Sequence, residues 1–142
     1  IRAIGVSNFR KHHLDELMKT AKIKPVVNQS YLNPSDLQPE VTAASKEYDL
    51  LNEAYSPLGT GGLLGNEVVG EVAENYGKSS AQVLIRWSLQ HGFLPLPKSV
   101  HPKYIAANGD VFDFEISPED MKKLDGLRGA SKLANDPDEV NF

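Results

Sequence analysis

The sequence lacks cysteine, a long apolar run and an excess of positive charge, and each absence excludes a class of protein. Without cysteine there is no disulfide framework, no thiolate metal site and no thiol nucleophile. No apolar stretch approaches the roughly 20 residues of a membrane span, and we find no signal peptide. The net charge of −4 provides no general attraction to nucleic acid or to anionic lipid. We therefore expect a cytoplasmic protein with neither a membrane nor a nucleic acid as its partner.

The composition is that of one globular domain. The 142 residues are 40% hydrophobic and 24% charged, as in folded soluble proteins. A chain of this length can bury about two-thirds of its unfolded surface. The sequence opens on residues 1–6, which have the pattern of a buried strand, and no methionine precedes them. Because natural domains seldom begin inside a core strand, we expect residue 1 to be a cut.

Short apolar segments alternate with helical patterns along the chain. The predicted strands cover about residues 1–6, 25–28, 50–54 and 93–97. The predicted helices cover about residues 10–21, 39–48, 68–77, 80–91, 102–108 and 117–127. We expect residues 1–128 to form one domain and residues 129–142 an irregular tail. The alternation predicts an α/β fold with a parallel sheet, either half of an eight-stranded TIM barrel or an open doubly wound sheet.

Polar residues follow each predicted strand. They are the pairs Ser7-Asn8, Asn28-Gln29, Tyr55-Ser56 and Lys98-Ser99. In both architectures the carboxyl ends of parallel strands meet at one edge, where ligands bind. The pairs therefore predict a ligand site at that edge. The structural alternative is that Ser7, Asn8 and Ser99 only cap the helices that follow them.

Two further segments suit phosphate groups. The glycine-rich residues 59–62 directly follow the aromatic ring of Tyr55, and the segment Lys98-Ser99-Val100 precedes a predicted helix amino terminus. Two phosphate-like sites with an aromatic ring between them indicate a dinucleotide. The alternatives are an ordinary glycine-rich surface loop and a solvated lysine.

The remaining titratable residues indicate neither a metal site nor a catalytic proton donor. His12 and His13 fall on the exposed face of a predicted helix, where we expect them to be solvated. His91 falls at a helix end, and His101 in a loop. Trp87 has the spacing of a core-facing helix residue.

Five segments stand out by their order and spacing. They are residues 1–9 (IRAIGVSNF), 27–29 (VNQ), 53–59 (EAYSPLG), 80–90 and 96–100 (LPKSV). Together they resemble the carboxyl-terminal half of an aldo-keto reductase, and the resemblance runs through essentially the whole chain. It implies the fifth to eighth units of a (β/α)8 TIM barrel. It also implies reduction of aldehydes and ketones to alcohols with NADPH.

The resemblance implies roles for residues at the nicotinamide end of that cofactor. Ser7, Asn8 and Gln29 would hold the carboxamide. Tyr55 would stack on the nicotinamide ring and determine which face delivers hydride, so its implied role is stacking and not proton donation.

Further residues would bind the rest of the cofactor. In chain order these are Ser56, Leu58 and Gly59 for the pyrophosphate, Lys98 and Ser99 with neighbouring Val100 for the 2′-phosphate, and Asn108 for the adenine. Tyr104 stands where the family usually has an arginine. An arginine would pair with the 2′-phosphate, so NADH stays an alternative to NADPH.

The family's catalytic aspartate, tyrosine, lysine and histidine lie in its first four units, upstream of Ile1. We therefore expect a fragment that carries the cofactor-binding half of an oxidoreductase acting on a small carbonyl substrate. Its expected partner is the missing amino-terminal half-barrel or another copy of itself. The alternative is a catalytically inactive dinucleotide-binding half-barrel.

Overall fold

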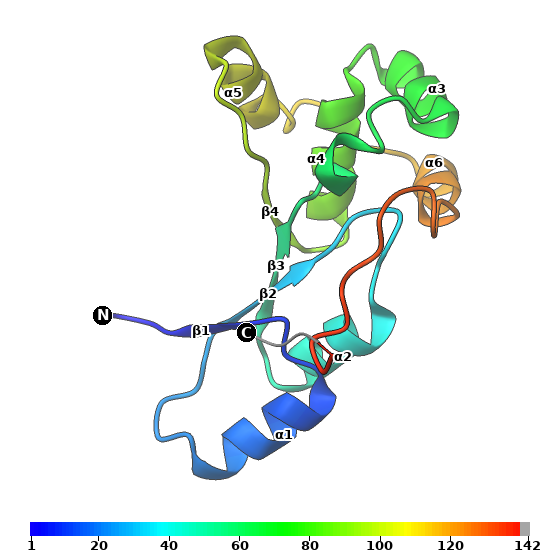
Figure 1. The fold of residues 1–142 in the computed structure, drawn as a ribbon. Coiled ribbons are helices and arrows are strands. Elements are labelled where there is room, and N and C mark those ends of the chain that lie inside the picture. The colour runs from blue at the N-terminus through cyan, green and yellow to red at the C-terminus, as the bar shows by residue number, and fades with distance from the viewer. Residues whose placement is uncertain (140–142) are drawn as a thin grey trace.

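A four-stranded parallel sheet forms the centre of the computed structural model, which describes residues 1–139 (Figure 1). Its strands are β1 (Gly5–Ser7), β2 (Val27–Tyr31), β3 (Leu51–Tyr55) and β4 (Leu94–Leu96). They pair in the order β1-β2-β3-β4, and each is parallel to the next. A doubly wound sheet requires a reversal of strand order. The doubly wound alternative is therefore wrong, and the arrangement is that of consecutive barrel units.

Within residues 1–139, six α-helices and one 3-10 turn connect and follow the strands. They are α1 (Lys11–Thr20), α2 (Pro39–Glu47), η1 (Gly59–Gly61), α3 (Glu67–Tyr76), α4 (Ser80–Gln90), α5 (Pro102–Gly109) and α6 (Pro118–Asp125). Side-chain caps begin three of the helices. Asn66 accepts from the Val68 and Val69 amides, Ser79 forms a capping box with Gln82, and Ser117 accepts from the Asp120 amide. None of the helices in residues 1–139 is long and apolar enough to cross a bilayer.

Two strands differ from the sequence prediction. β1 begins only at Gly5, and the preceding Ile1 and Ile4 are exposed. The prediction of a buried strand over residues 1–6 is therefore wrong, because no described strand lies beyond β1. β2 continues through Tyr31, so that Gln29 lies inside the strand and not at its end.

The register places one set of side chains on a common face of the sheet. Ser7 lies opposite Gln29, Gln29 opposite Glu53, and Glu53 opposite Leu94. The next row toward the carboxyl edge joins Tyr31, Tyr55 and Leu96. Residues two apart on a strand share a face, so both rows lie on the same side. No helix within residues 1–139 covers that side, and Leu94 and Leu96 remain 41% and 43% exposed there.

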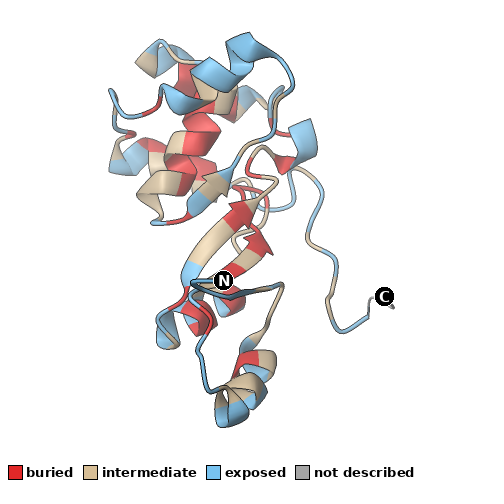
Figure 2. Ribbon diagram, turned by 90° about the vertical axis from the view of Figure 1, so that its left-hand side faces the viewer, coloured by how far each residue is buried: buried red, intermediate tan, exposed pale blue. Residues whose placement is uncertain are grey.

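The helices bury the opposite face in two clusters. The larger cluster joins α3, α4 and α6 to β3 through fully buried side chains that include Trp87, Leu84 and Leu124. The smaller one packs Leu14 of α1 against Ala44 of α2 and Leu50. Figure 2 shows buried residues concentrated in the helices of the larger cluster, whereas the chain near the amino terminus is exposed. Within residues 1–139, both helix-packed clusters therefore lie on one side of the sheet, whereas Tyr31 is buried on the other side.

The segment after α6 returns across the carboxyl edge of the sheet toward α1 (Figure 1). Ser131 Oγ donates to the Gly59 carbonyl at 3.0 Å, and Tyr31 Oη donates to the Lys132 carbonyl at 2.8 Å. Further along, the Ala134 amide donates to Asp36 Oδ2 at 2.9 Å. These bonds hold an otherwise irregular segment in place. The last three residues of the predicted tail, 140–142, lie outside the described residues.

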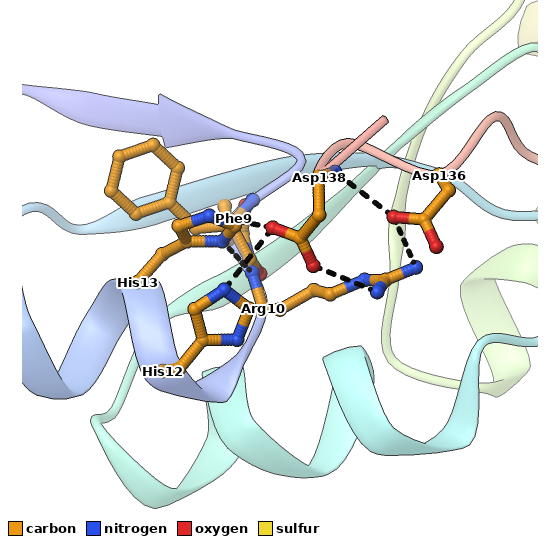
Figure 3. A network of polar contacts seen from close by, with 7 residues as sticks. Phe9, Arg10, His12, His13, Asp136 and Asp138 are labelled. Carbon is orange, nitrogen blue, oxygen red and sulfur yellow. Dashed lines mark hydrogen bonds and ion pairs between the residues drawn. The ribbon is translucent and has the colours of Figure 1, made fainter. Parts of the chain in front are cut away.

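A charged clasp, formed by Arg10, His12, His13, Asp136 and Asp138, joins this segment to the start of α1 (Figure 3). The two guanidinium nitrogens of Arg10 lie 2.9 Å from Asp136 Oδ1 and 2.9 Å from Asp138 Oδ2. The Asp138 amide and then Arg10 lower the pKa of Asp136 below its usual value, although desolvation opposes them. The clasp therefore stabilises the ionised form of Asp136.

The two histidines of the clasp both contact Asp138, which the sequence did not predict. Nε2 of His12 and Nε2 of His13 each lie 3.1 Å from Asp138 Oδ1. Their rings pack at 3.9 Å between centroids. His12 is 62% exposed, as expected, whereas His13 is half-buried. Their contact with Asp138 could not be predicted, because Asp138 lies 126 residues from His12 in the chain and no local pattern connects them.

Replacing Leu84 by alanine should destabilise the fold. Leu84 is fully buried in the larger cluster, so we expect Leu84→Ala to lose about 2–5 kcal/mol of unfolding free energy through transfer and cavity costs. Leu64 is 43% exposed, and the control Leu64→Ala should lose no more than about 1 kcal/mol. Urea unfolding followed by Trp87 fluorescence measures both. Equal losses would contradict the assigned core.

Replacing Asp138 by asparagine should loosen the returning segment. Asp138→Asn keeps the size of the side chain but removes the charge that Arg10 and the histidines contact. We expect trypsin to cleave after Lys132 several-fold faster in this variant. The control Glu139→Gln removes a neighbouring exposed carboxylate that forms no ion pair with residues 1–139. An unchanged cleavage rate in Asp138→Asn would show that the clasp does not hold the segment.

Candidate functional site

Three strands contribute adjacent polar groups to the uncovered face near its carboxyl edge. Ser7 Oγ donates to the Gln29 carbonyl at 3.1 Å, and the Asn8 amide donates to the same oxygen at 2.9 Å. The Gln29 side chain in turn donates from Nε2 to Glu53 Oε1 at 2.5 Å. The structure therefore brings Ser7, Asn8 and Gln29 together, as the sequence predicted.

A buried asparagine behind the sheet shapes the turn that carries Ser7 and Asn8. Asn28 is fully buried; its Nδ2 donates to the Phe9 carbonyl at 2.9 Å, and its Oδ1 accepts from the Phe9 amide at 3.3 Å. Asn8 adopts a left-handed conformation with φ of 56°, which asparagine tolerates better than most residues. The residue that caps α1 is Arg10. The alternative in which Ser7 or Asn8 caps this helix is therefore wrong.

Tyr55 presents an aromatic ring next to these amides. The ring is partly buried and packs edge-on against Tyr31 at 5.6 Å between centroids. Burial raises the pKa of the Tyr55 hydroxyl, and a hydrogen bond with the Asn8 side chain opposes that rise. Asn8 is thus near the Tyr55 hydroxyl, and the turn after β1 lies beside the end of β3. A raised pKa makes the hydroxyl a weaker acid, which suits a stacking surface better than a proton donor.

The loop after β3 is a tight turn that leaves two hydrogen-bond donors without a partner in the described residues. The Ser56 hydroxyl and the Leu58 amide form no hydrogen bond with another described residue. The amides of Gly59, Gly61 and Gly62, by contrast, donate to carbonyls within the loop. A Cβ on Gly62 would lie 2.4 Å from Ser131 Oγ, so this glycine permits the close approach of the returning segment. The donors available for an anion are thus at Ser56 and Leu58, whereas the glycines shape the turn.

Lys98, Ser99 and Val100 follow β4 after Pro97, and the register of β4 beside β3 places them at the same edge of the sheet. Lys98 is exposed and forms no ion pair within residues 1–139. Ser99 Oγ accepts from the His101 amide at 3.2 Å just before α5, so part of its role is structural. Asn108 lies in the last turn of α5, half-buried, and no hydrogen bond joins it to the other predicted residues in the described chain.

Two residues of this face were missed by the sequence analysis. Tyr31 supports Tyr55, and Glu53 holds the Gln29 amide. The signal that could have found them is the two-residue period of β2 and β3, which places Gln29 with Tyr31 and Glu53 with Tyr55 on one side. The predicted strands ended too early for that period to include Tyr31.

The arrangement fits a nicotinamide dinucleotide. The Asn8 and Gln29 side chains offer amide groups, Tyr55 offers a flat ring, Ser56 and Leu58 offer unpaired donors for a pyrophosphate, and Lys98 offers a cation. These groups lie at the carboxyl ends of neighbouring parallel strands, where such ligands bind.

The only cluster of metal-ligating side chains among residues 1–139 belongs to the clasp. Ligand atoms of His12, His13 and Asp138 lie within 4.8 Å of one another. The Arg10 amide, however, donates to His13 Nδ1 at 3.1 Å, which puts the ring proton on Nε2, the atom that faces Asp138. The Arg10 guanidinium also lies against Asp138 and would repel a second cation. The cluster therefore suits an ion-pair network and not a metal ion.

Comparison with known proteins agrees with this geometry. Residues 1–128 match the model of the aldo/keto reductase family. The glyoxal reductase of Bacillus subtilis is 50% identical over all 142 residues, which cover 51% of that protein. The 9,11-endoperoxide prostaglandin H2 reductase of Trypanosoma cruzi is 45% identical over 97% of the chain and 50% of its own length.

A solved structure supports the same relationship. A Gox0644 variant in complex with NADPH superposes with a TM-score of 0.93 at 38% identity, over 99% of this chain and 52% of that one. The chain thus spans about half the length of the relatives that it matches. The matched half is four consecutive units of a TIM barrel, and the chain belongs to the aldo/keto reductase family.

Proposed function

We propose that this chain is the cofactor-binding half of a reductase that converts aldehydes or ketones to alcohols with NADPH. The observation that carries the proposal is that Ser7 and Asn8 both donate to the Gln29 carbonyl at the edge of the sheet where Tyr55 ends β3. A relative that shares this fold over the matched half, at 38% identity, binds NADPH. NADH stays the alternative cofactor, because Tyr104 cannot pair with a 2′-phosphate as an arginine would.

In this proposal the chain binds and orients the cofactor. The Asn8 and Gln29 amides and the Ser7 hydroxyl would hold the carboxamide, and Tyr55 would cover one face of the ring. Ser56 and Leu58, beside Gly59, would bind the pyrophosphate, Lys98 and Ser99 with Val100 the 2′-phosphate, and Asn108 the adenine. The bound cofactor supplies the hydride. Because Tyr55 covers one ring face, a carbonyl could approach only the other face.

The open side of the sheet is the second part of the proposal. Among residues 1–139, β1 and β4 each have an unpaired edge, and Leu51, Leu94 and Leu96 are exposed on the uncovered face. Unpaired strand edges can pair with a further strand, and an exposed apolar face is typical of a surface that another part of a protein covers. We propose that four further βα units cover this face and supply the proton donor. Self-association is the alternative when those units are absent.

The Tyr55 ring should contribute strongly to cofactor affinity. We expect Tyr55→Ala to weaken NADPH binding by about 1–3 kcal/mol, the cost of losing one stacked aromatic ring. The matched control Tyr55→Phe keeps the ring and should bind within about twofold of the wild type. Titration by quenching of Trp87 fluorescence or by calorimetry measures both. Equal affinity of the alanine variant would exclude ring stacking at this position.

Turnover should require the other half of a barrel. We expect the chain alone to show no carbonyl-dependent loss of NADPH absorbance. Joined to the amino-terminal half of the Bacillus subtilis glyoxal reductase, whose other half is 50% identical to it, it should oxidise NADPH when glyoxal is added. The control fusion carries Tyr55→Ala. Turnover by the chain alone would refute the proposed division of roles, and NADPH binding without turnover by the fusion would favour an inactive dinucleotide-binding half-barrel.

A further inference from the structure

Glu53 contacts the Gln29 side chain directly across neighbouring strands. The two residues are register partners on β2 and β3, and Gln29 Nε2 donates to Glu53 Oε1 at 2.5 Å. Both are partly buried on the uncovered face. The pair lies in the row that also contains Ser7, one row below Tyr55. It is therefore within the candidate site and not on its periphery.

The carboxylate determines which way the Gln29 amide points. An ionised carboxylate only accepts hydrogen bonds, so Gln29 must turn its NH2 group toward it. Gln29 Oε1 then faces away, and it accepts no hydrogen bond from another residue in the part of the chain that the structure describes. A free carbonyl oxygen of fixed direction is the acceptor that a carboxamide NH2 group requires. Without Glu53, the two ends of the Gln29 amide could exchange.

The charge of Glu53 is not neutralised within the described chain. No lysine, arginine or histidine among residues 1–139 forms an ion pair with it; its row neighbours are Gln29 and Leu94. A negative charge close to a nicotinamide ring favours the oxidised ring, which is cationic, over the neutral reduced ring. Glu53 can therefore act in two separable ways: it orients the Gln29 amide, and its negative charge affects the nicotinamide ring.

We propose that Glu53 is a positioning residue of the cofactor site, which orients the Gln29 amide toward the carboxamide and favours the oxidised over the reduced nicotinamide. The inference rests on the proposed function, because it assumes that Gln29 meets the carboxamide. It extends that function by assigning to this chain a role in discriminating the two redox forms.

Two substitutions separate orientation from charge. Glu53→Gln keeps an acceptor for Gln29 but removes the charge, so we expect the affinity for NADP+ relative to NADPH to fall by about two- to fivefold, as for a partly exposed charge pair. Glu53→Ala also removes the acceptor, and we expect it to weaken NADPH binding by about two- to twelvefold. Glu74→Gln, an exposed carboxylate on α3, is the control for losing one negative charge elsewhere.

The measurements are dissociation constants for NADP+ and NADPH in the full chain, alone or completed by the half-barrel described above. The side-chain amide resonances of Gln29 in the cofactor-free protein provide a readout that does not depend on the ligand. They should shift in Glu53→Ala and stay unchanged in Glu74→Gln. Circular dichroism verifies that each variant folds.

The outcomes distinguish this inference from the proposed function. If the wild type binds neither NADP+ nor NADPH, the proposed function fails and the role of Glu53 fails with it. If the wild type binds both, an unchanged affinity ratio in Glu53→Gln overturns the charge effect. Unchanged NADPH affinity in Glu53→Ala, with unmoved Gln29 resonances, overturns the orienting effect. In those two cases the proposed function stands.

Discussion

The parallel register of β1, β2 and β3 is the constraint on which the site depends. It places Ser7, Gln29 and Glu53 in one row and Tyr31 with Tyr55 in the next. A slip of one residue in any strand would turn that strand's polar groups toward the helices and its buried residues toward the open face. The site thus depends on one parallel register shared by β1, β2 and β3.

The helix-covered face maintains that pairing and also shapes the edge. Asn28, directly between Val27 and Gln29 in sequence, points to the covered side and binds both backbone groups of Phe9. It thereby sets the turn in which Asn8 reaches Tyr55. On the far side of the site, Asn33 donates to the Ser56 carbonyl at 3.3 Å, and the segment after α6 contacts Gly59. Buried amides and a returning chain therefore hold the groups that remain free for a ligand.

Much of the fold follows from local sequence patterns, whereas its long-range contacts do not. Residues 117–120 show the signature of a capped helix start in Ser117 and Pro118, and the structure begins α6 at Pro118. Gln29 and Tyr55 could be predicted because polar and aromatic residues stand next to the apolar part of each strand. The pairing of Glu53 with Gln29 and the clasp between Arg10 and Asp138 could not, because each joins residues distant in sequence. The 3-10 turn at Gly59–Gly61 could likewise not be predicted from the sequence, because a glycine-rich segment can adopt many turn conformations.

The most direct test of the central claim is a residue-by-residue map of NADPH binding by nuclear magnetic resonance. We expect titration to shift the resonances of Ser7, Asn8, Gln29 and Tyr55 together with those of Ser56, Leu58 and Lys98, and to leave α1 and the clasp unchanged. Shifts confined to the clasp or to the outer helices, or no shifts at saturating NADPH, would contradict it.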